Sequence, residues 1–305
     1  MKKMLMPVGR RLAAGVALAL LGIVIGGCDL IDKVRSPTTP SPTTPTAPAP
    51  DAPIQYAALG ASDANGVGAS VTCPPLVACD NGTGYVPTLA RQLRGSRAVT
   101  VTNLGIPAAV LSPAIETIAL QHGRDVTGNF IEREMPFVPS NSTLVTISGG
   151  ANDINAVGDA MLQGAAGADV AGYIEAQTRA FGADYDRLVR GVRSRAPGAF
   201  IIILNVPNLA AMPFATRYPL EHRRVLQSIA VAFSREANRQ AAGGIVVLDL
   251  MCDPAMYSAA NFASDGFHPN DAGYSHIATR LAAVVNGASS SAAASCGPMT
   301  AVPAR

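Results

Sequence analysis

Residues 53–70 read "PIQYAALGASDANGVGAS", a short apolar run that leads directly into small residues. Gly60, Ser62, Gly66 and Gly68 all fall within this stretch. Such a pattern is typical of a strand that turns sharply into a helix, where backbone or a ligand must approach closely. The rest of the sequence has to decide whether Ser62 is a nucleophile.

Four further β-rich runs follow the first along the chain. The five predicted strands are residues 54–59, 98–104, 143–148, 199–205 and 244–250. Continuous apolar runs of this kind are typical of parallel strands that are buried on both faces. Helix-period segments lie between them, at 84–95, 173–196, 226–237 and 274–284. The alternation predicts an α/β fold over residues 53–286, a three-layer α/β/α sandwich with a five-stranded parallel sheet.

Three loops follow the first, third and fifth predicted strands. They contain Ser62, "GGANDI" at 149–154 and "SDGFHPND" at 264–271. Carboxyl ends of parallel strands form the ligand-binding edge of such sheets, so we expect these loops to meet there. Asp265 lies three residues ahead of His268, a spacing that lets it bind Nδ1 of the imidazole and leave Nε2 to take the proton of Ser62.

One asparagine and three aspartates are the other polar residues considered for a role. The side-chain amide of Asn152 can donate to an oxyanion, beside the backbone N–H of Ser62 and one from the loop after the second strand. Asp153 is predicted to be structural, bonding backbone amides. Asp63 and Asp249 remain fallback candidates for the acid.

The chain resembles the SGNH, or GDSL-type, hydrolase family. The blocks "LGAS", "NLGIPAA", "GAND" and "DGFHP" occur in the family's order between about residues 53 and 286. The resemblance implies a flavodoxin-like sandwich that needs no metal or cofactor and acts on esters, thioesters or acetylated sugars. It also implies that Ser62, Asp265 and His268 form the triad and that Asn152 is an oxyanion donor.

Two positions depart from the family pattern. Ala61 stands where the family usually has aspartate, and Ala108 stands where the second block has its glycine. Gly105 is close enough to be the alternative to Ala108. A backbone N–H survives a change from glycine to alanine, so the oxyanion site is weakened only if that residue needs a positive φ.

The N-terminus reads as a lipoprotein signal. Residues 1–27 combine a basic start with a 16-residue apolar run, which is shorter than the roughly 20 residues of a spanning helix. "IGGC" resembles a bacterial lipobox, so we expect lipidation of Cys28, export, and attachment to a membrane of the cell envelope. An ordinary cleaved signal and an uncleaved anchor are the alternatives. Residues 28–52 form a Pro/Thr-rich linker.

Four cysteines remain besides Cys28, and an even set outside the cytoplasm suggests disulfides. Four cysteines can pair in three ways, and we expect the most local one, Cys73 with Cys79 and Cys252 with Cys296. The second bridge would tether the C-terminal tail, residues 287–305. No Cys-x-x-Cys occurs and the four histidines are scattered, so no metal site is predicted. The formal charge is +2, which becomes −2 without the four basic residues of the signal, and this balance does not indicate a nucleic-acid partner.

Together these observations predict a secreted, membrane-anchored serine ester hydrolase that works as a monomer on a small ester. The alternative is a lipoprotein that kept the fold as a binding or scaffold module after losing activity, which Ala61 and Ala108 would favour. We expect the connection from Ile106 to Ser142 to shape the substrate pocket.

Overall fold

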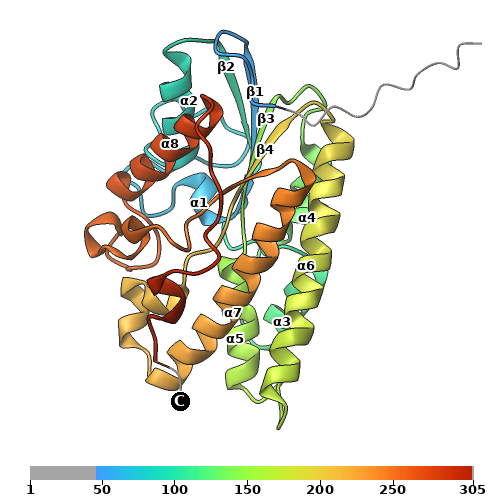
Figure 1. Ribbon diagram of the computed structural model, residues 1–305, viewed down its shortest axis with the longest axis vertical. Coiled ribbons are helices and arrows are strands. Elements are labelled where there is room, and N and C mark those ends of the chain that lie inside the picture. The colour runs from blue at the N-terminus through green and yellow to red at the C-terminus, as the bar shows by residue number, and fades with distance from the viewer. Residues whose placement is uncertain (1–45, 304–305) are drawn as a thin grey trace, which may run out of the picture. The chain divides into compact units, whose positions relative to one another are not determined.

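The computed structural model describes residues 46–303 and contains one parallel sheet at its centre (Figure 1). Its strands are β1 (Ile54–Gly60), β2 (Val99–Asn103), β3 (Leu144–Ser148), β4 (Phe200–Leu204) and β5 (Val246–Leu248). The order is β2-β1-β3-β4-β5, and every neighbouring pair is parallel. The predicted α/β sandwich with five parallel strands is therefore confirmed.

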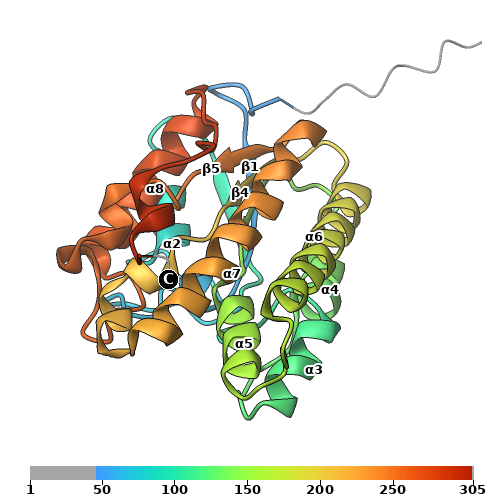
Figure 2. The ribbon, with the colours of Figure 1, turned by 60° about the horizontal axis from the view of Figure 1, so that its bottom comes forward.

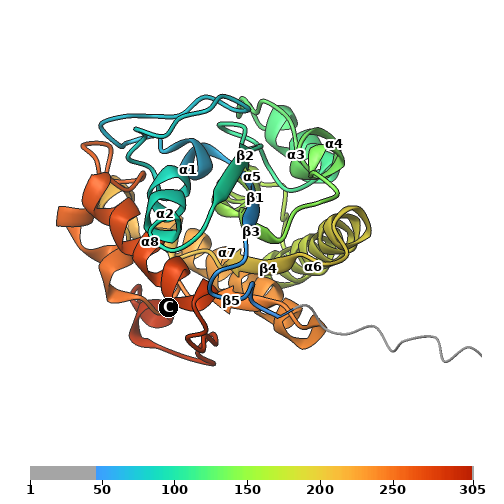
Figure 3. The same cartoon turned by 90° about the horizontal axis from the view of Figure 1, so that it is seen from above.

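Helices cover both faces of the sheet. They are α1 (Ser62–Asn65), α2 (Tyr85–Arg94), α3 (Pro113–Gln121), α4 (Phe130–Arg133), α5 (Ala151–Leu162), α6 (Val170–Arg195), α7 (Leu220–Arg239) and α8 (Asp271–Val285). Seen from above, α2 and α8 lie on one face, and α4 and α6 lie on the other (Figure 3). Figure 2 shows α7 packed against α5 and α6.

Burial follows the apolar pattern of the sequence. Every residue of β3 and β4 is buried, as expected for strands with a helical layer on each side. The helices also bury apolar side chains against one another: Phe181 of α6 stacks on Phe233 of α7 with ring centroids 4.0 Å apart. On the opposite face, α8 buries Tyr274, Ile277 and Leu281.

The element boundaries differ from prediction at several places. The long helix α6 begins at Val170, three residues before the expected start, because the side chain of Asp169 accepts a hydrogen bond from the N–H of Gly172 and caps it. Strand β5 is only three residues long. Helices α3, α4 and α5 were not predicted.

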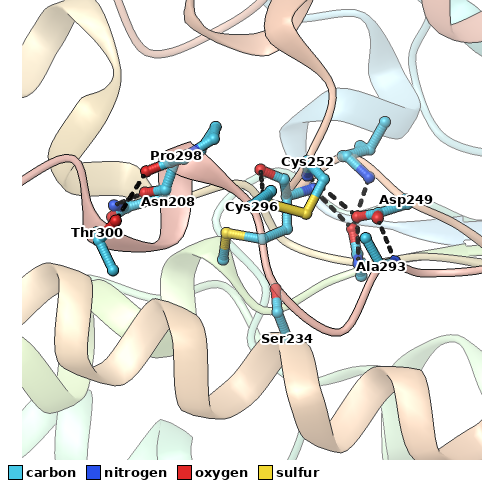
Figure 4. The surroundings of a disulfide bond; sticks show 12 residues. Asn208, Ser234, Asp249, Cys252, Ala293, Cys296, Pro298 and Thr300 are labelled. Carbon is cyan, nitrogen blue, oxygen red and sulfur yellow. Dashed lines mark hydrogen bonds between the residues drawn. A yellow bond between two sulfur atoms is a disulfide. The ribbon is translucent and has the colours of Figure 1, made fainter.

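Both predicted disulfides are present, Cys73–Cys79 and Cys252–Cys296. The second fastens the C-terminal tail to the loop after β5 (Figure 4). The tail is also held by Asp249, whose Oδ2 accepts from the N–H of Ala293, and by Asn208, whose amide donates to the carbonyl of Pro298.

The predicted signal peptide, Cys28 and most of the linker lie outside the described residues. None of the helices within residues 46–303 has the length and apolar character needed to span a bilayer. The last residues of the linker contact the domain: the side chain of Arg97 donates to the carbonyls of Pro48 and Ala49.

Candidate active site

Ser62, His268 and Asp265 form a continuous chain of hydrogen bonds. The Oγ of Ser62 lies 3.0 Å from Nε2 of His268, and Nδ1 of the same ring lies 2.6 Å from Oδ2 of Asp265. The serine side is sheltered and the acid side is open: Ser62 is 9% exposed, and the side chain of Asp265 is 47% exposed. Ser62 follows the end of β1, and Asp265 and His268 lie in the loop before α8, as their positions in the sequence predicted.

Glycines let these two segments approach each other. Helix α1 ends after one turn at Gly66, which has a φ of +72° and whose N–H donates to the carbonyls of Ser62 and Asp63. Gly68 also has a positive φ, and a Cβ there would lie 2.7 Å from the Cβ of His268. The small residues of 58–70 are therefore needed for close contact with the histidine loop.

Asp265 organises the histidine loop by itself. Its Oδ1 accepts from the N–H groups of Phe267 and His268, which is an Asx-type turn, while Oδ2 faces the imidazole. Burial raises the pKa of this carboxyl, but the hydrogen bonds from the ring and from the two N–H groups outweigh it and hold the pKa below its usual value. The group therefore stays ionised and can stabilise an imidazolium.

The two fallback acids lie elsewhere. Asp63 faces Tyr274, whose hydroxyl is 3.2 Å from its Oδ1, and burial raises its pKa despite the nearby charge of His268. Asp249 accepts from the amide of Asn205 and from the N–H groups of Cys252 and Ala293. Neither carboxylate bonds the histidine, so Asp265 is the only one of the three candidates placed to orient it.

The loop after β2 makes a tight turn at Ala108. The N–H of Ala109 donates to the carbonyl of Ile106 at 3.1 Å, which closes a four-residue turn with Pro107 and Ala108 at its corners. Ala108 has a φ of +62°, the value that a type II turn requires at this corner and that normally selects glycine. The position does need a positive φ, and its alanine is strained.

Gly105 is not the alternative donor. Its N–H already donates to Oδ1 of Asn103 at 3.1 Å, and a Cβ at this position would lie 2.5 Å from that of Ala64. The N–H of Ala108 has no hydrogen-bond partner among residues 46–303. Of the two positions, Ala108 is therefore the one with a backbone donor to offer.

Asn152 and Asp153 tie the start of α5 to the loop after β2. Nδ2 of Asn152 donates to the carbonyl of Ala109 at 2.9 Å, which uses one of its two amide hydrogens. The buried Asp153 accepts from the N–H of Leu111 at 2.8 Å, which is the structural role predicted for it. Burial raises the pKa of Asp153 to about 7, although this hydrogen bond and that of its own N–H lower it.

A cleft opens beside Ser62. Its walls are mainly apolar, with Leu204, Val206, Leu209, Met212, Met256 and Phe262 among them. Asn205 also borders the cleft, but its oxygen accepts from the N–H groups of Leu250 and Met251 and its amide donates to Asn238 and Asp249. The cleft thus presents hydrocarbon next to the serine.

The walls of the cleft do not come from the connection that we expected to form them. None of its lining residues lies between Ile106 and Ser142. That connection contains α3 and α4, and the cleft is lined instead by the segments that follow β1, β3, β4 and β5.

No sequence pattern indicated Glu134, whose side chain contacts the backbone two residues before Ser62. It is fully buried, and its Oε2 accepts from the N–H of Gly60 at 2.8 Å. A lone glutamate between two predicted elements carried no motif that could have revealed it. Within residues 46–303, no group of three or more His, Cys, Asp or Glu side chains is arranged to hold a metal ion.

Residues 58–276 match the family model of the GDSL-like lipases and acylhydrolases. The chain belongs to this family. Among solved structures, a lipase from a goat rumen metagenome is similar, with 18% identity and a TM-score of 0.53 over 75% of this chain and 96% of that one. An acetyl xylan esterase from Geobacillus stearothermophilus, solved as a variant, has 15% identity and a TM-score of 0.51 over 79% and 98%.

At these identities the two structures share the fold of this GDSL-like hydrolase and say nothing of its substrate. No curated protein matches the sequence. Membership of the family supports a hydrolase of the esterase or lipase type.

Proposed function

We propose that this GDSL-like protein is an exported, membrane-anchored serine esterase that cleaves esters of acyl chains longer than acetyl through an acyl-enzyme on Ser62. The observation that carries the proposal is the chain of hydrogen bonds from Ser62 through His268 to Asp265, with distances of 3.0 and 2.6 Å. A serine hydroxyl is a weak nucleophile until a base takes its proton, and this chain supplies the base and its orienting acid.

In the proposed reaction, Oγ of Ser62 attacks the acyl carbonyl while its proton passes to Nε2 of His268. The carbonyl π electrons move to the oxygen, then return as the bond to the alcohol breaks, and His268 gives the proton to the leaving oxygen. In the second half, His268 takes a proton from water, whose oxygen attacks the acyl carbonyl; the bond to Oγ of Ser62 then breaks, and His268 returns the proton to Oγ as the acid leaves. Asp265 stabilises the imidazolium in both halves through its bond to Nδ1.

Three donors are available for the oxyanion. They are the N–H of Ser62, the N–H of Ala108 and the second amide hydrogen of Asn152, whose first is bonded to Ala109. Donors of this kind stabilise charge that develops only in the transition state, and losing one typically costs on the order of 10² to 10³ in kcat.

The apolar cleft supports an acyl chain longer than acetyl as the group transferred. Each buried methylene contributes about 0.8 kcal/mol, which is roughly fourfold in kcat/KM if the gain is kept in the transition state. We therefore expect p-nitrophenyl butyrate to be cleaved roughly tenfold faster than the acetate in kcat/KM. Equal rates on the two esters would mean that the acyl chain does not enter the cleft.

Two methionines offer a matched pair for testing the cleft. Met212 lines it and is 4% exposed, whereas Met161 on α5 is 8% exposed and lies outside it. Met212→Ala should move the preferred chain length upward, because it lengthens the cleft, and Met161→Ala should leave the chain-length profile unchanged. The same shift in both variants would assign it to loss of stability.

The decisive test of the activity uses two serines that are equally exposed. Ser62 and Ser148 are each 9% exposed and both line the cleft, but only Ser62 bonds His268. Ser62→Ala should abolish hydrolysis of a p-nitrophenyl ester panel, and Ser148→Ala should retain it. If the wild type hydrolyses no activated ester, the chain is better described as a binding module.

The cellular location remains a proposal from the sequence. Lipidation at Cys28 predicts that membrane-extracted protein begins at a diacylated cysteine, which intact-mass measurement can show. A soluble product that starts at another residue would contradict the anchor.

A further inference from the structure

Glu134 bonds the end of β1, which is itself hydrogen-bonded to the segment that carries the second backbone oxyanion donor. It follows α4 directly and is fully buried, and its Oε2 accepts from the N–H of Gly60. Gly60 is in turn bonded to the loop after β2, because its carbonyl accepts from the N–H of Ile106 at 3.0 Å. The side chain of Glu134 therefore fixes the last residue of β1, and that residue bonds the loop that follows β2.

The donors lie two residues beyond each bonded position. Ser62 follows Gly60 by two residues, and Ala108 follows Ile106 by two. A Cβ added at Gly60 would lie 2.8 Å from that of Ala64. The backbone at Gly60 therefore packs against α1 with no space for a side chain. A change at Glu134 would move both segments relative to each other, and with them the two N–H groups.

Burying this carboxyl group is unfavourable for folding. Its Oε1 has no hydrogen-bond partner among residues 46–303, and burial raises the pKa of the carboxyl group well above the usual value, although the hydrogen bond from Gly60 and the nearby N–H of Ile106 lower it. Ala61, between Gly60 and Ser62, has no polar side chain that could bond this turn in its place. A costly group at this exact point indicates a role other than stability.

We propose that Glu134 is a positioning residue that sets the separation of the two oxyanion donors. The inference rests on the proposed esterase function. Its physical basis is that displacing a reacting group by about 1 Å can cost on the order of a hundredfold in rate. The acceptor oxygen is what matters here, so an amide oxygen in its place should serve nearly as well.

Three substitutions test the contact through kcat and KM on p-nitrophenyl butyrate. Glu134→Gln keeps an acceptor and should hold kcat within about threefold of wild type, whereas Glu134→Leu removes it and should lower kcat at least tenfold with little change in KM. Glu134→Asp withdraws the carboxyl group by one methylene and should lower kcat severalfold, which keeps the test open if the leucine variant does not fold. Wild-type kcat in a folded leucine or aspartate variant would overturn the proposal.

A buried residue far from the site separates positioning from stability. Leu93, near the far end of α2, is 1% exposed, and Leu93→Ala should lower the melting temperature without lowering kcat. If kcat falls equally in Leu93→Ala and Glu134→Leu at the same loss of melting temperature, Glu134 is merely structural.

Amide hydrogen exchange tests the proposal without any activity. Peptides covering 58–63 and 103–109 should exchange faster in Glu134→Leu (or Glu134→Asp) than in wild type, while those of α2 should not. Leu93→Ala should give the reverse pattern. Unchanged exchange at 58–63 and 103–109 would overturn the positioning role, and an inactive wild type with the expected exchange pattern would count only against the esterase.

Discussion

Replacing Ala108 by glycine should make the protein more stable. Ala108 occupies the left-handed region at φ +62°, which costs an L-residue roughly 1–2 kcal/mol. Glycine adopts this conformation freely but loses roughly 0.4–1 kcal/mol through its greater freedom in the unfolded chain. The difference predicts a net gain of about 0.5–1 kcal/mol for Ala108→Gly.

The surroundings explain why the strain persists in the native state. The carbonyl of Pro107 accepts a hydrogen bond from the hydroxyl of Thr127, and that of Ala109 accepts from Asn152. The N–H of Ile106 is bonded to Gly60. With the turn fixed on all sides, the alanine has no relaxed alternative, and glycine should relieve the strain without moving the N–H.

Thermal unfolding at one scan rate measures the effect. A gain of about 1 kcal/mol raises the melting temperature of a domain of this size by about 2–4 °C, so we expect Ala108→Gly to melt about 1–4 °C higher. Ala283→Gly is the matched control, because this exposed residue lies inside α8 and glycine there should cost about 1 kcal/mol.

The esterase rate should change little, since the donor at residue 108 is a backbone group. A melting temperature that falls in Ala108→Gly as it does in Ala283→Gly would refute the assignment of strain. A large loss of kcat in a folded Ala108→Gly would show that the alanine methyl, rather than the backbone, matters at this turn.

Three further predictions address other parts of the molecule. Asn152→Ala should lower kcat by about 10² to 10³ and His268→Ala by at least about a thousandfold, with circular dichroism unchanged; a smaller loss would remove either residue from the mechanism. The raised pKa of Asp153, about 7, means that its contribution to stability is full below its unfolded pKa of about 3.9 and is lost as the pH rises toward 7. The melting temperature of Asp153→Asn minus that of wild type should therefore be larger at pH 8 than at pH 4. The same difference at both pH values would contradict the raised pKa. Replacing Cys252 and Cys296 together by serine should cost about 4 kcal/mol in urea unfolding, because the bridge closes a long loop; a loss under about 1 kcal/mol would show that the tail's hydrogen bonds suffice.

Sequence patterns predicted the sheet well because its strands are buried on both faces. A run such as residues 199–205 is apolar at nearly every position, and only a central parallel strand needs that. Strand β5 ends before its apolar run does. The N–H groups of Leu250 and Met251 donate to the side chain of Asn205 and not to the backbone of a neighbouring strand.

The missed helices lack a clear apolar period. Helix α5 begins at "AND", which reads as a turn, and it is fixed by tertiary contacts such as that of Asp153 with Leu111. Helix α3 did leave a signal that was overlooked, since Ser112 is followed by proline at the first helical position and its side chain accepts from the N–H of Ile115.

The placement of Ser62, Asn152 and His268 could be predicted because each sits in a short motif in a segment that follows a predicted strand. The strain at Ala108 could be raised only as a condition, because a φ value is not visible in a sequence. Glu134 and the cleft were beyond prediction: both depend on chain segments that meet only in three dimensions.

The central claim is that Ser62 is the nucleophile, and covalent labelling tests it most directly. Incubation with a p-nitrophenyl alkylphosphonate should add one phosphonyl group per chain by intact mass, and peptide mapping should place it on Ser62. Ser148→Ala should be labelled like wild type, and Ser62→Ala should remain unlabelled. No adduct on the folded wild type, or an adduct that persists in Ser62→Ala, would contradict the account.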